Sequence, residues 1–581
     1  MQQETKQCQN CKQQFVIEPQ DFAFYQKMQV PPPTFCPECR LQRRLAWRNE
    51  RTLYARTCDL CKKQIIGMYP AQAPFPVYCN ECWWSDKWNS LDFGKDYDFS
   101  KPFFEQFSEL AKTLPRFPLF KKQTKNSEYT NVIVESVNCY LTFACIKSED
   151  CAYGKTVWEC RNVFDALYCY KCEQCYEIID CNGCYNLRFS RDCVNCRDSS
   201  YLLDCSNCRD CFGCVGLKNK QYCFNNEQCT KEEYEKKVAE WKKKSFTNFV
   251  NFPRRFAMLL KSAHSTGNHM TDCNDCITCF DIKDSEDSKY IFTSAKSKDS
   301  YDCSYMGLPA ELAYEAVTSY SYNIRFSINN FDNLTISYCT DCYTSENMFG
   351  CIGISKGRYC ILNKQYSKDE YEALVPKIIQ HMKDIPYTDK AGRTYGYGEF
   401  FPVQLSPFAY NETVAQEFFP LTREQALSQG HSWKEPEKRN VVATISSEKL
   451  ADDATKIDDS ILKQVIACQH EGRCNEQCTG AFRIIPPELD FYRKMKLSLP
   501  RLCPNCRHYE RLAQRNPLKL WQRQCQCARK TDNKQLTTNN YRNTTTHFHT
   551  DKPCPNTFET SYSPERPEIV YCEHCYLSEV V

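Results

Sequence analysis

The chain has 581 residues, of which 43 are Cys and only 17 are Gly, and 75 basic residues nearly balance 72 acidic ones. This length suggests about four domains of roughly 150 residues each. An apolar content of 42% is enough to form cores, which excludes a chain that is disordered throughout. The formal charge of +3 excludes a chain that coats nucleic acid or an anionic membrane along its whole length, so such a partner would have to bind locally.

No targeting segment is recognisable in the sequence. No run approaches the roughly 18 consecutive apolar residues of a membrane span, and the start, MQQETKQCQN, lacks the apolar core of a secretory signal. We therefore expect a cytoplasmic protein without a membrane partner. Thiols stay reduced in the cytosol, so the cysteines are interpreted as metal ligands and buried thiols, although an unusual export route would allow disulfides.

The amino-terminal region contains four CxxC pairs, which are typical of four-cysteine zinc sites. A CxxC turn directs two thiolates at one point, and two such turns complete the tetrahedron that zinc prefers. Pairing in sequence order gives two sites, with a cross-brace pairing as the alternative. The predicted ligands are Cys8, Cys11, Cys36 and Cys39 for the first site and Cys58, Cys61, Cys79 and Cys82 for the second.

An arginine-rich segment follows the second CxxC pair. Pro37 suits the first turn of a helix, and Leu41 and Leu45 follow at helical spacing, as in a treble clef or zinc ribbon. Arginines interleaved with Trp47 and Tyr54 could grip phosphates and stack on bases. The alternatives are a solvated helix face and arginines that pack on acidic neighbours. The candidate nucleic-acid residues are Arg40, Arg43, Arg44, Arg48 and Arg51, together with Arg511 and Arg515 near the carboxyl end.

The carboxyl end repeats the amino-terminal unit. Residues 478–516 match residues 11–49 at a constant offset of 467 without a gap. This predicts a third site with its opening pair widened to CxxxC, and a fourth around an insertion rich in Thr and Asn. In the fourth site we expect Cys572 and Cys575 to be joined by two ligands from Cys525, Cys527 and Cys554, and we expect no histidine among the ligands. The third site is predicted to use Cys474, Cys478, Cys503 and Cys506, so that the whole chain would hold about four zinc ions.

Between the two ends the cysteines repeat in steps of three residues. All seventeen from Cys139 to Cys229 share one phase, and all eight from Cys273 to Cys360 share another. A period of three fits neither a plain strand nor an α-helix. It favours a β-solenoid whose frequent corners make every third residue point inward. Segments 212–237 and 349–374 align at an offset of 137, so the solenoid is predicted to be duplicated, with a capping box and a closing helix at the end of each copy.

The solenoid thiols have two main interpretations, and neighbouring inward thiols could also form disulfides under oxidation. Cys exchanges with Ser, Val, Ala, Leu and Ile at the same phase, which favours a small buried residue that fills the core. Runs such as Cys205, Cys208, Cys211 and Cys214 would instead suit soft metals, which favours an array of zinc, copper(I) or iron–sulfur sites.

These features predict a mostly β protein with small α+β zinc modules. Duplicated zinc-ribbon or treble-clef modules at both ends would flank two cysteine-rich β-solenoids that are capped by helices. An aromatic strap over residues 386–440 would pack on a neighbouring domain or, if exposed, bind a partner. The expected domains are 1–92 for paired zinc modules, 93–128 for a helix and linker, 129–262 and 263–385 for the solenoids, 386–440 for an aromatic strap, 441–465 for a polar linker, and 466–581 for the C-terminal zinc modules.

Several further segments point to a family. They are CPECR, DFSKPFFEQF, YGEFFP, SPFAYNETVAQEFFPLT and PERPEIVYCEHCY. With them the whole chain resembles a group of uncharacterised cysteine-rich zinc-ribbon proteins of small-genome, candidate-phylum bacteria. The resemblance implies the domain layout and no established activity.

The motifs favour a protein that is not an enzyme. The sequence contains no GxGxxG, P-loop, GxSxG, HExxH or zinc-deaminase pattern. Four-cysteine zinc sites also leave no open coordination position for water. The leading hypothesis is a zinc-binding scaffold that presents surfaces to a macromolecular partner, either nucleic acid, including the ribosome, or protein. The alternatives are a thiol-rich metal store or redox protein and an enzyme that uses a solenoid groove; the oligomeric state is left open.

Overall fold

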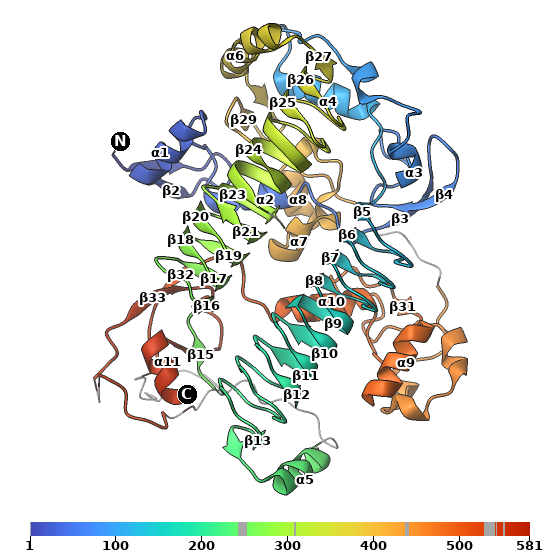
Figure 1. The fold of residues 1–581 in the computed structure, drawn as a ribbon, viewed down its shortest axis with the longest axis vertical. Coiled ribbons are helices and arrows are strands. Elements are labelled where there is room, and N and C mark those ends of the chain that lie inside the picture. Colours follow the sequence, from blue (N-terminus) through green and yellow to red (C-terminus); the bar gives the residue numbers. More distant parts are fainter. Residues whose placement is uncertain are drawn as a thin grey trace.

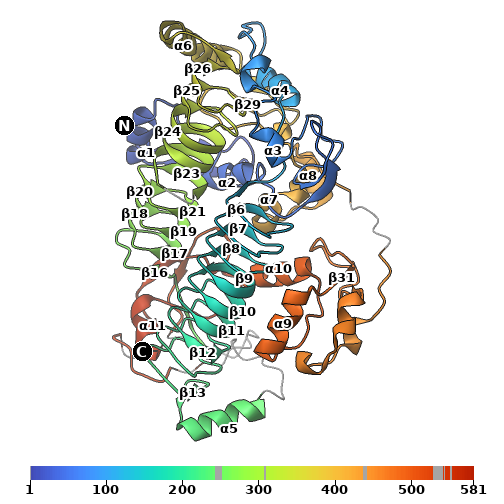
Figure 2. The same ribbon diagram turned by 45° about the vertical axis from the view of Figure 1, so that its right-hand side comes forward.

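The computed structural model describes residues 2–241, 252–306, 309–435, 441–527, 541, 543–549 and 552–580. Two β-solenoids lie side by side, and small cysteine-containing modules pack against them (Figures 1 and 2). Phe120, where the first solenoid starts, stacks on Phe331 late in the second, with ring centroids 4.9 Å apart. Asp192, late in the first, pairs with His269 early in the second. The two solenoids therefore run in opposite directions.

The first solenoid is built on one parallel eight-stranded sheet in which each strand pairs with the strand one coil later. Paired residues lie twelve positions apart, as in Val157 with Cys169 and Glu173 with Tyr185. The strands are β5 (Lys121–Lys122), β6 (Asn131–Val134), β7 (Phe143–Ile146), β8 (Lys155–Trp158), β9 (Arg161–Tyr170), β10 (Glu173–Ile179), β11 (Tyr185–Arg191) and β12 (Arg197–Ser200).

A left-handed corner recurs at every third residue of this solenoid. From Gln123 to Asp210 every third residue has a φ between 46° and 66°. Asn and Asp, which tolerate this region better than other side chains, occupy many of the corners. The residue after each corner points inward; Cys169, Cys172 and Cys181, for example, are at most 1% exposed. The predicted three-residue rhythm is confirmed, and its cause is a coil with a corner after every three residues.

The inward thiols act as hydrogen-bond donors at these corners. The Sγ atom of Cys172 lies 3.3 Å from the carbonyl oxygen of Tyr170 and 3.5 Å from that of Cys181. Ser148 makes the same pair of contacts, because its Oγ lies 3.1 Å from the carbonyl oxygens of Ile146 and Val157. Cys and Ser therefore exchange within one phase because both are small and both can donate to the backbone of the next coil.

The second solenoid repeats this architecture in a twelve-stranded sheet. In one of its coils the paired residues, Cys303 and Ala316, lie thirteen positions apart instead of twelve. Its strands are β16 (Leu259–Leu260), β17 (Gly267–Thr271), β18 (Asn274–Ile277), β19 (Cys279–Lys283), β20 (Glu286–Lys289), β21 (Phe292–Ala295), β22 (Ser297–Lys298), β23 (Tyr301–Met306), β24 (Ala310–Ser337), β25 (Glu346–Phe349), β26 (Arg358–Ile361) and β27 (Lys364–Gln365).

A helix follows the last coil of each solenoid, as predicted. In the first solenoid the hairpin β13 (Cys223–Phe224) and β14 (Glu227–Gln228) leads into α5 (Lys231–Trp241). In the second, α6 (Lys368–Asp384) starts with a capping box between Ser367 and Glu370. The backbone amide of Glu233 likewise donates to the side chain of Thr230.

The segments between the solenoids and the modules are ordered where described. The expected helix forms as α4 (Phe103–Thr113), and the strap carries β28 (Tyr387–Thr388), β29 (Thr394–Tyr395), α7 (Val414–Phe418) and α8 (Arg423–Ser428). Phe400 and Phe401 are fully buried, so the strap packs on its neighbours. Residues 441–465 differ from the polar linker that we expected, because Leu450, Ala454 and Ile461 are buried against the hydrophobic face of α9 (Pro486–Met495).

Four cysteine modules share one plan, a two-stranded antiparallel hairpin followed by at least one helix. We number them in chain order. The first contains β1 (Glu4–Gln7), β2 (Gln14–Ile17), α1 (Pro19–Lys27) and α2 (Pro37–Leu45), and the second β3 (Tyr54–Thr57), β4 (Gln64–Gly67) and α3 (Asn80–Trp83). The third contains β30 (Ile466–Ala467), β31 (Ala481–Phe482), α9 (Pro486–Met495) and α10 (Pro504–Ala513), and the fourth β32 (Trp521–Gln524), β33 (Thr557–Thr560), β34 (Val570–Tyr571) and α11 (Glu573–Val580). The last of these strands, β34, pairs with β15 (Arg254–Arg255).

Candidate metal centres

The first module gathers its four cysteines at the start of α2. Cys36 is the N-cap of this helix, and its backbone amide donates to the Sγ atom of Cys8 at 3.2 Å. The Sγ atoms of Cys11 and Cys36 are 3.7 Å apart. Cys39 completes the group. A tetrahedral ion with metal–sulfur bonds of about 2.3 Å needs sulfur–sulfur edges of about 3.8 Å, so this group can hold a metal ion.

The second module repeats this geometry. The backbone amide of Cys79 donates to the Sγ atom of Cys58 at 3.2 Å, and the Sγ atoms of Cys61 and Cys79 are 3.7 Å apart. Cys82 is the fourth member of the group. Burial by itself raises the pKa of Cys58, but the hydrogen bonds donated by the backbone amides of Cys61 and Cys79 outweigh burial and lower the pKa to about 6. In both amino-terminal modules the cysteines that meet are those of the sequential pairing.

In the third module the structure adds a cysteine that the sequence reasoning missed. Cys468, Cys478, Cys503 and Cys506 form the four-thiol group, while the Sγ atom of Cys474 lies 3.7 Å from that of Cys506. Cys468 corresponds to Cys8, because it follows the first hairpin strand and accepts a backbone amide, that of Cys503, at 3.2 Å. A seven-residue insertion separates Cys468 from Cys478, and the ungapped match begins only after it. The set expected from the sequence, Cys474, Cys478, Cys503 and Cys506, therefore lacks Cys468.

The fourth module has a longer insertion at the same place. Cys525 corresponds to Cys58 at an offset of 467, whereas Cys554, Cys572 and Cys575 correspond to the later ligands of the second module at an offset of 493. These four thiols form one group. Cys527, from the insertion, forms a second group with Cys554, Cys575 and His549. The sequence predicted no histidine among the ligands, but His549 belongs to this second candidate group, with its Nε2 atom 3.1 Å from the Sγ atom of Cys527.

The arginine-bearing helix of the first module docks on the second solenoid. Arg40 and Arg44 both pair with Asp302, with nitrogen–oxygen distances of 2.8 and 3.1 Å, and Arg43 pairs with Glu315 at 2.6 Å. Arg40, Arg43 and Arg44 are at most 2% exposed. Burial opposes the charge of Arg40, but Asp302 outweighs it, so the pKa of Arg40 is raised.

The helix of the third module docks on the first solenoid in the same way. Arg507 and Arg511 pair with Asp165, and Arg511 also pairs with Glu177 at 2.9 Å. Asp165 corresponds to Asp302 at the solenoid offset of 137, and Arg507 and Arg511 correspond to Arg40 and Arg44 at the module offset of 467. One ion-pair arrangement is therefore present twice.

Aromatic contacts are duplicated together with these ion pairs. The guanidinium carbon of Arg48 lies 4.1 Å from the ring centroid of Tyr305, and that of Arg515 lies 4.0 Å from Tyr168. The rings of Phe24 and Tyr301 stack at 3.8 Å. Their counterparts, Phe491 and Phe164, stack at 4.0 Å. Each half of the chain therefore repeats both sides of the same interface.

The acidic partners in the first solenoid lie at equivalent positions of successive coils. Tyr153, Asp165 and Glu177 are left-handed corner residues, each twelve positions after the last, so they lie on neighbouring coils about 4.8 Å apart. Arginines four residues apart in a helix share one face and are about 6 Å apart along it. Arg507 and Arg511 can therefore both reach Asp165, and Arg511 also reaches Glu177 on the next coil.

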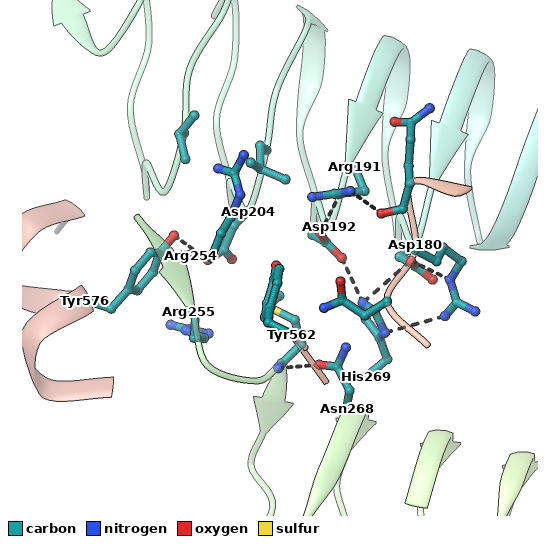
Figure 3. A pocket seen from close by; sticks show the side chains of 16 residues that line it. Asp180, Arg191, Asp192, Asp204, Arg254, Arg255, Asn268, His269, Tyr562 and Tyr576 are labelled. Carbon is teal, nitrogen blue, oxygen red and sulfur yellow. Dashed lines mark hydrogen bonds and ion pairs between the residues drawn. The ribbon is translucent and has the colours of Figure 1, made fainter. Parts of the chain in front are cut away.

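Figure 3 shows where the third and fourth modules meet both solenoids. His269 reaches the carboxylates of Asp180 and Asp192, and the hydroxyl of Tyr576 donates to Asp204 at 2.6 Å. Arg515 pairs with Asp180 at 2.9 Å. The residues enclose a cavity of about 30 Å³, which leaves room for ordered water but not for a substrate.

These positions oppose the expectation that the arginines form a phosphate-binding surface. Six of the seven candidates, all except Arg51, are at most 8% exposed. Arg51 contacts the third module, where its Nη2 atom lies 3.2 Å from the Oδ1 atom of Asn505. In the structure these arginines pack on acidic neighbours, which is the alternative that the sequence offered.

Within the described residues, no helix is both long enough and apolar enough to cross a membrane. Compared with known proteins, the sequence matches no family model and no curated protein.

Proposed function

We propose that this protein is a non-enzymatic, zinc-dependent scaffold in which the cysteine modules clamp two solenoids together. The observation that carries the proposal is the duplicated interface: a helix that begins at a four-thiol group places buried arginines against carboxylates of a solenoid wall, once between the first module and the second solenoid and once between the third module and the first solenoid. An ion at each group would fix the start of the helix, and hence the position of its arginines.

Zinc is the ion that the donor set favours. Four converging thiolates suit zinc, and such closed sites serve structure because no position is left for water. The amino-terminal groups contain only cysteine ligands. The arrangement therefore supports a structural role for the metal.

The thiols of the solenoids support this function over metal storage. All of them are buried except Cys229, which is partly buried, and most donate to backbone carbonyls, as Cys172 does. Burial raises the pKa of Cys151 and Cys169 well above the usual value, which keeps these thiols protonated and poor ligands.

The experiment that tests this function is the zinc content of purified full-length protein, measured by native mass spectrometry. Cys36→Ser and Cys79→Ser should each lose one zinc ion. The matched control is Cys172→Ser, where serine can make the same hydrogen bonds and the zinc count should not change. Protein that folds and holds no zinc, or loss of zinc in the control alone, would refute the proposal.

For the partner class, we propose a protein rather than nucleic acid. A cleft of about 780 Å³ is lined by Trp83, Trp84, Trp158 and Tyr343, and its lysines share the lining with Glu135 and Glu159. A mixed charge and many aromatic rings suit an aromatic peptide side chain better than a run of phosphates. Selection from a displayed random-peptide library should enrich aromatic peptides whose binding Trp84→Ala and Trp158→Ala weaken at least tenfold. Binding of a single-stranded RNA oligonucleotide at this cleft, without any selected peptide, would overturn the choice.

A further inference from the structure

We propose that the fourth cysteine module holds two metal ions that share two bridging thiolates. Six donor atoms converge there: the Sγ atoms of five cysteines and the Nε2 atom of His549. They form two groups that overlap in Cys554 and Cys575. This inference rests on the proposed function, because it assumes that the modules bind zinc.

The distances suit two tetrahedra that share an edge. The shared thiols, Cys554 and Cys575, are 3.8 Å apart, close to the edge of about 3.8 Å that zinc–sulfur bonds require. On one side Cys572 lies 3.9 Å from Cys554. On the other side Cys527 lies 3.4 Å from Cys575. Each side thus has two ligands of its own and two that are shared.

A single ion cannot use all these donors, because zinc in a structural site takes four ligands. The five thiols are all at most 8% exposed. If all five were ionised around one divalent ion, the net charge would be about −3, whereas a second ion reduces it to about −1. Since unpaired buried charge is costly, the second ion stabilises the set of donors that the fold has assembled.

The hydrogen bonding of His549 supplies independent support. Its Nδ1 atom lies 2.6 Å from the backbone carbonyl oxygen of Lys552 and must therefore carry the proton. The Nε2 atom is then left with a free lone pair, and this atom lies 3.1 Å from Cys527 and 3.5 Å from Cys575. A histidine fixed in this way by a carbonyl oxygen has the form in which metal-binding histidines are usually found.

Comparison with the second module shows where the additional donors come from. That module has only Cys58, Cys61, Cys79 and Cys82, and their counterparts form the first group of the fourth module. Cys527 and His549 both belong to the 26-residue insertion between Cys525 and Cys554. The insertion therefore adds the two ligands that a second ion needs, and the chain should bind five ions instead of four.

The test is native mass spectrometry of the full-length protein loaded with zinc. The wild-type chain should hold five ions, and Cys527→Ser and His549→Gln should each hold four. His547→Gln is the matched control, because the Nε2 atom of His547 pairs with Glu579 at 2.7 Å. It should keep five ions. His549→Cys should also keep five, since a thiolate can replace the imidazole ligand.

The two proposals can fail separately. If His549→Gln and Cys527→Ser fold and keep the wild-type number of ions, while Cys36→Ser loses one, the two-ion site is wrong and the zinc scaffold stands. If Cys36→Ser loses no zinc, the scaffold itself is wrong. Loss of the fifth ion in His549→Cys would also contradict the site, because it would show that His549 acts through packing and not as a ligand.

Discussion

The Nη1 atom of Arg44 lies 3.1 Å from a carboxylate oxygen of Asp302, and neither side chain has any exposed surface. Asp302 belongs to β23 of the second solenoid, while Arg44 belongs to the helix that begins at the first four-thiol group. A contact between residues this far apart in sequence ties the first four-thiol group to the solenoid. Burial makes the pair costly to break, since removal of one partner leaves an uncompensated charge.

We therefore predict that Asp302→Ala lowers the free energy of unfolding by about 3–5 kcal/mol. Its counterpart Asp165→Ala should act similarly, because Asp165 pairs with both Arg507 and Arg511. Urea denaturation measures the change. The control is Glu286→Gln, which removes an ion pair with Lys298 whose side chains are both 49% exposed. It should change stability by less than about 1 kcal/mol. Equal effects in all three variants would contradict the docking role.

His269 should make the stability depend on pH. Its imidazole faces Asp180, Asp192, Asp281 and Arg515. Burial lowers its pKa, but the carboxylates outweigh this effect and raise it to about 9. Because the folded pKa lies above the unfolded value of about 6.5, the contribution is complete below pH 6.5 and is lost as the pH rises through 9.

Between these limits wild-type stability should fall by about 3 kcal/mol. His269→Gln should lack this loss, and chemical denaturation at a series of pH values measures it. The exposed His264, whose side chain is 79% accessible, provides the matched control variant His264→Gln. A pH dependence unchanged by His269→Gln would show that other groups cause it.

The solenoid thiols should resist alkylation in the folded, zinc-loaded protein. Cys151 and Cys169 are buried and their pKa values are raised by burial, so little thiolate forms. Cys229 is only partly buried. Iodoacetamide followed by peptide mass spectrometry should find Cys229 modified first, with Cys151 and Cys169 modified only after unfolding. Equal modification of all three at neutral pH would indicate an open or reactive solenoid.

Local patterns made the solenoids and the amino-terminal groups predictable. One residue in three points inward because a left-handed corner recurs every three residues, and this rule acts on neighbouring residues. The sequential grouping of Cys8 with Cys39 likewise needs only a hairpin and the helix that soon follows it. Such features leave a regular trace in a single sequence.

The misses have two physical causes. Cys468 and His549 are separated from their partners by insertions, so spacing alone could not place them; the apolar strand residues before Cys468 were the remaining signal. The role of Arg40 and Arg44 depends on Asp302, and no local rule indicates which distant wall a helix will contact. Acidic residues one coil apart, such as Asp302 and Glu315, together with arginines four residues apart on a helix, are the pattern that could have revealed it.

The central claim is that metal in the modules holds the solenoid walls in place. Hydrogen exchange before and after removal of metal by a chelator tests it most directly, with the amides of β9 and β23 as reporters, because these strands carry Asp165 and Asp302. We predict that exchange in both strands accelerates at least tenfold when the metal is removed and recovers when zinc is restored. Unchanged exchange in fully metal-free protein would contradict the account.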